Sequence, residues 1–585
     1  MRHTRSLRVA RVARVALTTL AGLAAALGWT AAPATALPAL DPATIAVPAG
    51  LGTGRVLLVR PARIDVVADG HVRRVVPLTG RLDLARLPAL VGDPAYTSAP
   101  EPGVVRIDAT LAQRPGSEVG AGPGLSELRL GSAGLLHGTR SRLELERVAV
   151  AIAGGRAIGT DAPIRYTNGS TVELRGVTVR GALRDRPATP PSVQVDGGTT
   201  LTAEHVRIAG GGEAALRVAD AGEVSLNDVV LESASGNGLD VTGGDALELA
   251  RVTARENGGV GVVLRQPGDL RVQSGLRATG NRAAGVDLLG LRNVRLTGLV
   301  TSANGGPGVS LRSSQDVFLT GVRSSDDVAG VHITGSADIH VADYVSRGSS
   351  NGLSVKDTAR FDANGATVAD ARDDGITLAG RSLTLADVRV EGAGEGLVVS
   401  AGSNGVTMRD SRFGGDRSGV RIAAGTNDVT LRRVTADAPN GVALRSGGDR
   451  ILVEGVTATG GVGVDLRGNA SIEHSSVRAT AAALRVAEYG RVGVRSSALS
   501  ARELGISAAP GSQVLVTGST IDARRAVTGD VTIGDGNEVS RQPIRWVGIA
   551  GLTAMFLAVG LEVMRKTRER GERVTRAPGH VLNRT

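Results

Sequence analysis

The stretch SDDVAGVHIT places two adjacent carboxylates, Asp326 and Asp327, close to His332, one of only eight histidines in the chain. Imidazole is the commonest general base near neutral pH, and a neighbouring carboxylate can orient it. Arg312 and Lys356 lie 20 and 24 residues away from His332 along the chain, and either could hold an acidic group. These side chains are the types needed to remove a proton beside a carboxylate.

The same stretch belongs to a repeat, in which a Gly or another small residue followed by Val, Leu or Ile recurs every 21 to 24 residues. Examples are Gly308-Val309, Gly330-Val331 and Gly352-Leu353. Alternating apolar segments such as VFLTGV and IHVADY follow about ten residues later, and period-two alternation predicts two short strands per unit, separated by tight turns. Units of this kind stack as coils of a β-solenoid with parallel strands about 4.8 Å apart.

Strand alternation assigns each position of a coil to the core or to the surface. Counting from the Gly as zero, positions 1 and 3 point inward and positions 2 and 4 point outward. Position 4 carries Arg312 and Lys356, roughly 8 Å from position 2 of the adjacent coil. Position 2 carries, in consecutive coils, Asp287, Ser310, His332 and Ser354.

A catalytic hypothesis follows from this arrangement. His332 would be the base for epimerisation or β-elimination of a uronate, with Arg312 or Lys356 on the sugar carboxylate and Asp326 or Asp327 orienting the ring. The simpler alternative is that His332 is an exposed strand residue among ordinary polar neighbours. The expected substrate-binding residues are Asp287, Ser310, Ser354, Asp373 and Asp374.

The acidic pairs Asp326-Asp327 and Asp373-Asp374 each precede a repeat step, two coils apart. Their backbones would lie about 9–10 Å from each other, which suits a sugar chain better than a single ion. Calcium is a candidate because hard oxygen ligands are present, but Asp is also a preferred turn residue that forms local hydrogen bonds. We therefore expect no metal site and no cofactor.

The two ends of the chain carry targeting signals. Five arginines, a short apolar run and Ala34-Thr35-Ala36 predict an export signal over residues 1–36. WVGIAGLTAMFLAVGLEVM, residues 546–564, predicts a transmembrane helix, and the basic tail, 565–585, should stay cytoplasmic. A small β-rich segment and linker at 37–103 and a repeat domain at 104–540 would face outward from the cell membrane.

The formal net charge of +10 is concentrated at these ends. The signal contributes five positive charges, the tail contributes a net five, and Arg545 offsets Glu562, so the body is near neutral. The body of the protein therefore has no excess of basic residues that would indicate nucleic-acid binding. Because the chain has no cysteine, no disulfide stabilises the exported body.

GVSLRSSQDVFLTGV and GVDLLGLRNVRLTGL resemble the coils of right-handed parallel β-helix proteins of the pectate-lyase-like superfamily. The resemblance covers residues 104–540 and implies an all-β, single-stranded right-handed parallel β-helix, followed here by the C-terminal transmembrane helix. The opening coil, VVRIDATLAQRPGSEVGAGPGLSELRL, is similar to the start of the helical domain of exported mannuronan C5-epimerases. Their Asp-Pro-His-Asp motif is absent from this chain, so the resemblance assigns no catalytic residue.

Two functions from different classes fit these observations. One is a membrane-anchored extracellular β-helix that binds an acidic cell-surface polysaccharide and modifies it as a C5-epimerase or lyase would. The other is a non-catalytic scaffold or adhesion rod at the cell surface. A convergence of His332, Lys356 and a carboxylate in one groove would favour the enzyme, whereas their dispersal over a flat face would favour the rod.

Overall fold

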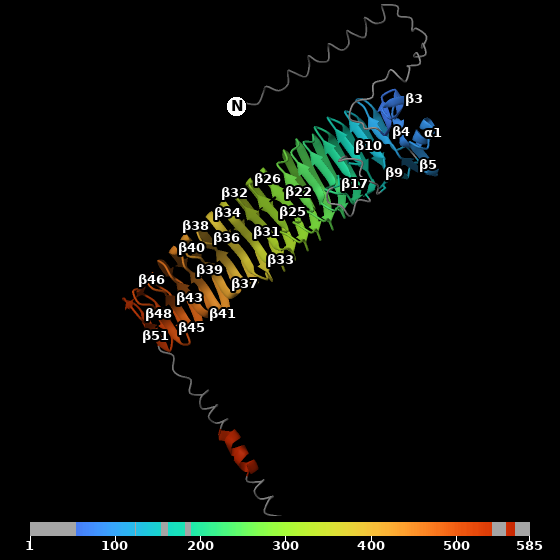
Figure 1. Ribbon diagram of the computed structural model, residues 1–585. Helices are drawn as coiled ribbons and strands as arrows, with labels where there is room; N and C mark the ends of the chain where they lie inside the picture. Colours follow the sequence, from blue (N-terminus) through green and yellow to red (C-terminus); the bar gives the residue numbers. More distant parts are fainter. Residues whose placement is uncertain (1–53, 123, 154–161, 182–188, 541–556, 568–585) are drawn as a thin grey trace, which may run out of the picture.

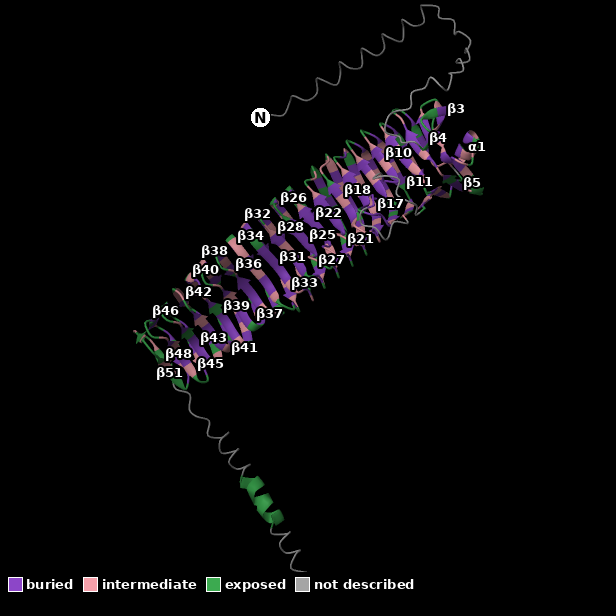
Figure 2. Cartoon of the chain, in the orientation of Figure 1, coloured by how far each residue is buried: buried purple, intermediate pink, exposed green. Residues whose placement is uncertain are grey.

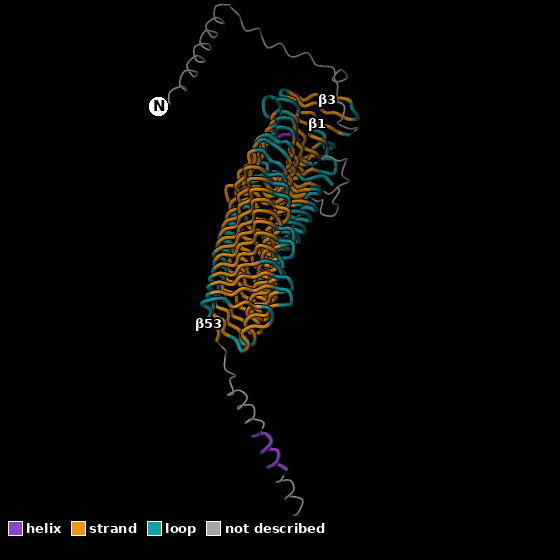
Figure 3. Tube along the Cα trace, turned by 90° about the vertical axis from the view of Figure 1, so that its left-hand side faces the viewer, coloured by secondary structure: helices purple, strands orange, loops and turns teal. Residues whose placement is uncertain are grey.

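The computed structural model describes residues 54–122, 124–153, 162–181, 189–540 and 557–567. Short strands stack on one another along a single axis and form an elongated solenoid, with the N-terminal strands at one end and the last strands at the other (Figure 1). Nearly all of the strand pairs between successive coils are parallel and in register. The view after a quarter turn shows the same stacking, with turns above turns along the rod (Figure 3).

Each coil contains three strands. One coil comprises β28 (Val309–Arg312), β29 (Gln315–Thr320) and β30 (Arg323–Ser325), and the next comprises β31 (Ala329–Thr334), β32 (Ala337–Ala342) and β33 (Val345–Arg347). β28 pairs with β31, β29 with β32 and β30 with β33, all in parallel. We call the three resulting faces sheet 1, sheet 2 and sheet 3, in that order.

The expectation of two strands per unit was therefore incomplete, because it missed sheet 3. The strands β30 and β33 have three residues each, RSS and VSR. A single inward residue flanked by polar ones gives no alternating pattern in the sequence. These strands can therefore be recognised only from their pairing with the strands of adjacent coils.

The core is a continuous column of aliphatic side chains. In the coil that starts at β28, Val309, Leu311, Val317 and Leu319 are completely buried, and the same positions are buried in neighbouring coils. Burial of a side chain of this size stabilises a fold by about 1.5–3 kcal/mol. Figure 2 shows buried residues along the strands of the whole rod. The inward positions thus specify the solenoid and leave the outward positions free to vary.

The N-terminal end differs from the repeat. β1 (Arg55–Arg60), β2 (Arg63–Ala68) and β3 (His71–Pro77) form an antiparallel meander, and β1 also pairs in parallel with β7 (Thr110–Gln113). The helix α1 (Leu87–Val91) lies beside them. This arrangement covers the open edge of the first coil, where unpaired backbone groups would otherwise recruit other strands.

The C-terminal end runs from β51 (Arg525–Thr528) through β52 (Val531–Ile533) to β53 (Glu538–Ser540). Residues 557–567 are helical. Within the ranges that the structure describes, we find no helix with the length and apolar character needed to cross a bilayer. Much of the predicted span, and the whole predicted export signal, lie outside those ranges.

Candidate functional site

The outward row of sheet 1 brings several of the predicted site residues into line. Parallel register pairs Asp287 with Ser310, Ser310 with His332, His332 with Ser354, and Ser354 with Thr377. The strands involved are β25 (Val286–Leu289), β28, β31, β34 (Asn351–Asn364) and β36 (Asp374–Ala386). Sequence spacing had predicted the same alignment of the first four residues.

Arg312 and Lys356 differ in what they contact. Arg312 forms a two-pronged ion pair with Asp287, with Nε–Oδ1 at 3.2 Å and Nη2–Oδ2 at 2.6 Å. The Asp287 residue is only 9% exposed. Lys356 is exposed, and no carboxylate among the described residues lies within ion-pair distance of it. Of these two cations, Lys356 is therefore the one that remains available to a ligand.

His332 is half-buried in a hydroxyl-rich setting. Its Nε2 lies 3.0 Å from Thr334 Oγ1, and the flanking Ser310 and Ser354 are largely buried. Burial, and then the positive charges of Lys356 and Arg312, lower the pKa of His332. The imidazole is therefore neutral at pH 7, which suits hydrogen bonding to a sugar hydroxyl.

The structure does not bring Asp326 or Asp327 to the His332 ring. Asp326 is exposed and has a left-handed backbone, with φ of 57°. Asp327 turns inward and is 1% exposed. Its Oδ2 accepts hydrogen bonds from Thr301 at 2.8 Å and Ser324 at 2.7 Å. Sequence proximity predicted that one of these carboxylates would orient His332. The turn instead directs both carboxylates away from the His332 ring.

Asp327 instead ends an internal asparagine ladder. Asn257 Nδ2 donates to Asn281 Oδ1 and Asn281 Nδ2 to Asn304 Oδ1, each at 2.9 Å. Asn304 then donates its backbone N and its Nδ2 to Asp327 Oδ1, both at 2.9 Å. Stacked amides of this kind satisfy buried polar groups at equivalent turns. The role of Asp327 is therefore structural.

Asp373 and Asp374 also separate in space. Asp373 is exposed, whereas Asp374 is half-buried, in register with Glu395 of the next coil. Burial, and then the charge of Glu395, raise the pKa of Asp374. Arg417 lies 3.7 Å from Asp374, and Arg421 pairs with Glu395 at 2.6 Å. In the described part of the chain, no group of three acidic or histidine side chains is placed to hold a metal ion.

Sequence reasoning missed a row of stacked side chains on sheet 2. The Arg295 guanidinium lies 4.4 Å from the Phe318 ring centre, and Phe318 stacks on His340 at 4.4 Å with 14° between the planes. His340 Nδ1 hydrogen-bonds to Asp362 in the following coil. The spacing of 22 residues from Phe318 to His340 to Asp362 is the signal that could have revealed this row. Both faces of the Phe318 ring are occupied, so it offers no platform for a ligand.

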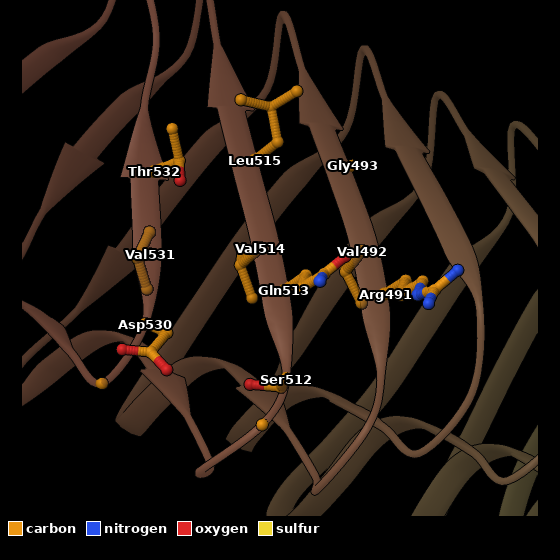
Figure 4. Close-up of a pocket in the computed structure, with 12 residues that line it drawn as sticks. Arg491, Val492, Gly493, Ser512, Gln513, Val514, Leu515, Asp530, Val531 and Thr532 are labelled. Carbon is orange, nitrogen blue, oxygen red and sulfur yellow. The ribbon is translucent and has the colours of Figure 1, made fainter.

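Two hollows lie near the C-terminal end of the rod. One, of about 930 Å³, opens over sheet 2 across β46 (Arg491–Arg495), β49 (Gln513–Thr517) and β52 (Figure 4). Gly493 has no side chain to fill the row that continues to Leu515 and Thr532. The second hollow, of about 510 Å³, lies over the end of sheet 1 and includes Arg467, Arg485 and Tyr489. Neither contains a residue of the predicted site.

Comparison with known proteins supports the fold. The family model described as right handed beta helix region matches residues 191–343 and 284–457. No curated protein matches the chain significantly.

Three solved structures illustrate the likeness, all with low identity. The periplasmic alginate epimerase AlgG is 9% identical, over 80% of this chain and 85% of its own, with a TM-score of 0.22. The pre-mature bacteriophage phi29 gene product 12 is 10% identical, over 74% and 69%, with a TM-score of 0.35. The A-module of the Azotobacter vinelandii mannuronan C-5 epimerase AlgE6 is 15% identical, over 74% and 92%, with a TM-score of 0.21.

At these values no activity passes from those proteins to this chain, and an architecture of this kind serves many unrelated functions. The family model and the three parallel sheets agree on the architecture itself. The described coils form a right-handed parallel β-helix.

Proposed function

We propose that this protein is an exported β-helix that binds an acidic cell-surface polysaccharide along sheet 1, without transforming it. The observation that carries the proposal is the exposed Lys356 ammonium, which has no carboxylate partner in the described ranges. Beside it stand the neutral His332 and the hydroxyl of Thr334. An unpaired cation beside a hydroxyl and an imidazole can bind a carboxylate together with its neighbouring sugar hydroxyls.

The shape of the face supports a linear ligand. Sheet 1 runs along the rod with in-register strands, so equivalent outward positions recur every ~4.8 Å. A linear polymer can follow such a row without bending. The tether predicted at 546–564, with the basic tail inside the cell, would keep this face at the site of export.

The dispersal of the carboxylates argues for binding rather than turnover. Asp287 is held by Arg312, and Asp327 is buried at the end of the asparagine ladder. In the described residues, no acidic side chain contacts His332 that could complete a base and acid pair. The protein is thus proposed as a rod with a polymer-binding face, and a rod with no glycan ligand is its rival.

Calorimetry of the full-length protein in detergent micelles tests the proposal. We expect polymannuronate and polygalacturonate to bind and dextran not to bind, with weaker binding at 300 mM than at 50 mM salt, because salt screens exposed charges. Lys356→Ala should weaken polyuronate binding several-fold. Lys566→Ala is the matched control, since Lys566 is the other lysine of the chain and lies in the tail. Equal binding of dextran, or no binding of either polyuronate, would overturn the proposal.

The same samples report on catalysis. NMR would detect inverted C5 centres, and ultraviolet absorbance would detect unsaturated chain ends. We expect neither signal after prolonged incubation. Turnover that disappears in His332→Ala would replace the binding proposal with the catalytic hypothesis.

Topology is tested separately by cysteine labelling, which is clean because the chain has no native cysteine. Thr459→Cys is placed at an exposed body position and Thr585→Cys at the end of the tail. A membrane-impermeant maleimide should label the first in intact cells and the second only after permeabilisation. The reverse pattern would contradict the proposed orientation.

A further inference from the structure

The hollow of about 510 Å³ over the last coils of sheet 1 has the size of a small-ligand site, for which roughly 300–1,000 Å³ is usual. It lies over β43 (Thr457–Leu466), β45 (Ser476–Val486) and β48 (Leu504–Ala508) and the turns that follow them. Its polar side chains are those of Asp465, Arg467, Arg485, Glu488, Tyr489 and Ser507.

Tyr489 is unusual in its exposure. It is 80% exposed, whereas Tyr96, Tyr166 and Tyr344 are at most 4% exposed. Of the aromatic residues in the described ranges, it alone is exposed. Its φ of 61° is in the left-handed region, which other turn residues of this solenoid, such as Gln266 and Asp357, also adopt. An exposed ring that lines a hollow contributes little to the core, which points to a ligand.

A glycine turn of the next coil lies beside the Tyr489 ring. Gly511 has φ of 74°, and a β-carbon there would lie 3.4 Å from Tyr489 Cε1. The ring thus has the glycine turn of the next coil as a neighbour and is otherwise largely open to solvent. Aromatic rings presented in this way pack against the apolar faces of ligands and keep a polar tip in water.

The two arginines of the hollow are available for an anion. No carboxylate among the described residues lies within ion-pair distance of Arg467 or Arg485. Arg445, in the adjacent coil, pairs with Asp465 at 3.6 Å and so occupies one of the two carboxylates nearby. Three arginines thus face two carboxylates, Asp465 and Glu488, and the guanidinium groups that remain are suited to two-pronged carboxylate binding.

We propose that this hollow is a second binding subsite, specific for an anionic sugar residue. The pyranose ring packs its C–H face on Tyr489, and Arg467 and Arg485 hold its carboxylate. This subsite deepens the proposed function, on which it rests for the class of polymer. Ser354 and Arg485 occupy equivalent outward positions of sheet 1, six coils apart. At about 4.8 Å per coil, the two residues are roughly 29 Å from each other. A single polyuronate chain could therefore engage both positions.

Calorimetry with trigalacturonate, which is too short to span the two positions, tests the subsite in the full-length protein in micelles. We expect Tyr489→Ala to weaken its binding at least about tenfold, and Tyr489→Phe, which keeps the ring, to retain most of it. Joint replacement of Arg467 and Arg485 by Ala should weaken binding further than Tyr489→Ala does, because hydrogen bonds to charged groups are strong. The charge control is Arg450→Ala on sheet 2, which should bind as the unmodified protein does. Maltotriose, the neutral control, should bind far more weakly than trigalacturonate.

The outcomes separate the subsite from the central site. Unchanged trigalacturonate binding in Tyr489→Ala, in protein with an unaltered melting temperature, would overturn the subsite, and polymer binding that still depends on Lys356 would leave the proposed function intact. Trigalacturonate binding that depends on Tyr489, with polymer binding indifferent to Lys356→Ala, would support the subsite and overturn the central site.

Discussion

The central and the C-terminal coils of sheet 1 share a backbone and differ in how their arginines are used. In the centre Arg265 pairs with Asp240, Arg312 with Asp287 and Arg421 with Glu395. At the C-terminal end, Arg467 and Arg485 have no such partner among the described residues, and Tyr489 stands exposed beside them. In the central coils these arginines of sheet 1 form ion pairs within the protein. At the C-terminal end, Arg467 and Arg485 remain available to a ligand. A solenoid permits this division because its inward residues specify the coil whatever the outward residues do.

The largest effect should arise in the centre, where buried polar groups depend on one carboxylate. Asp327→Ala removes the acceptor for four hydrogen bonds and should destabilise the protein by about 3 kcal/mol. Its exposed neighbour supplies the control: Asp326→Asn, which tolerates the left-handed backbone, should change stability by less than about 0.5 kcal/mol. Urea denaturation followed by circular dichroism measures both. Similar stabilities for the two variants would show that the asparagine ladder does not depend on Asp327.

The arginine pairing can be tested directly by comparing the two regions. Arg312→Ala leaves the largely buried Asp287 without its partner and should cost about 1–2 kcal/mol, discounted because Arg312 itself is half-exposed. Arg485→Ala, at the C-terminal end, should cost almost nothing in unfolding free energy. Combining Arg312→Ala with Asp287→Ser should restore most of the loss. If Arg485→Ala proves as costly as Arg312→Ala, the proposed contrast between the regions fails.

Replacement of Tyr489 should increase the unfolding free energy, in contrast to the two replacements above. Tyr489→Asn relieves the left-handed backbone and should raise the unfolding free energy by about 1 kcal/mol, because Asn tolerates that conformation. The same variant should lose trigalacturonate binding. A gain in stability with a loss of binding is expected where strain is kept for function. A variant that loses both would indicate a structural role for the ring.

The smallest effect concerns the pH dependence of the central coils. The folded pKa of His332 is lowered below its unfolded value of about 6.5, so below that pH the unfolded chain binds more protons. The contribution of His332 to stability is therefore complete above pH 6.5 and declines as the pH falls below it. His332→Gln should remove this decline.

Lys356→Ala should raise the pKa of His332, because it removes a nearby positive charge. NMR titration of ¹³C-labelled histidine would follow the shift in the full-length protein. A downward shift, or an unchanged stability profile in His332→Gln, would contradict the electrostatic account.

Several features followed from the sequence because the repeat interval sets the register. The spacing of Asp287, Ser310, His332 and Ser354 predicted one outward row, and parallel pairing places them in it. The alternation of apolar residues likewise predicted two of the three sheets. The third escaped because three-residue strands such as β30 contain too little alternation to be recognised.

The directions of side chains at turns did not follow from the sequence. Asp326 and Asp327 are adjacent and identical in type, yet the left-handed backbone at Asp326 sends one carboxylate to solvent and the other into the core. Nor could spacing alone show that Arg312 is occupied by Asp287 while Lys356 is available. Tyr489 went unremarked because its significance lies in exposure, and the sequence does not record exposure.

The sequence by itself determined the repeat, its register and the division of each strand into core and surface, because period-two alternation at a fixed interval allows few other ways to bury the apolar residues. Tertiary structure alone decided which polar groups are consumed by contacts between coils and which remain free to bind. That outcome depends on side chains about 22 residues apart meeting across a ladder, and on turn conformations that rotate one residue relative to the next.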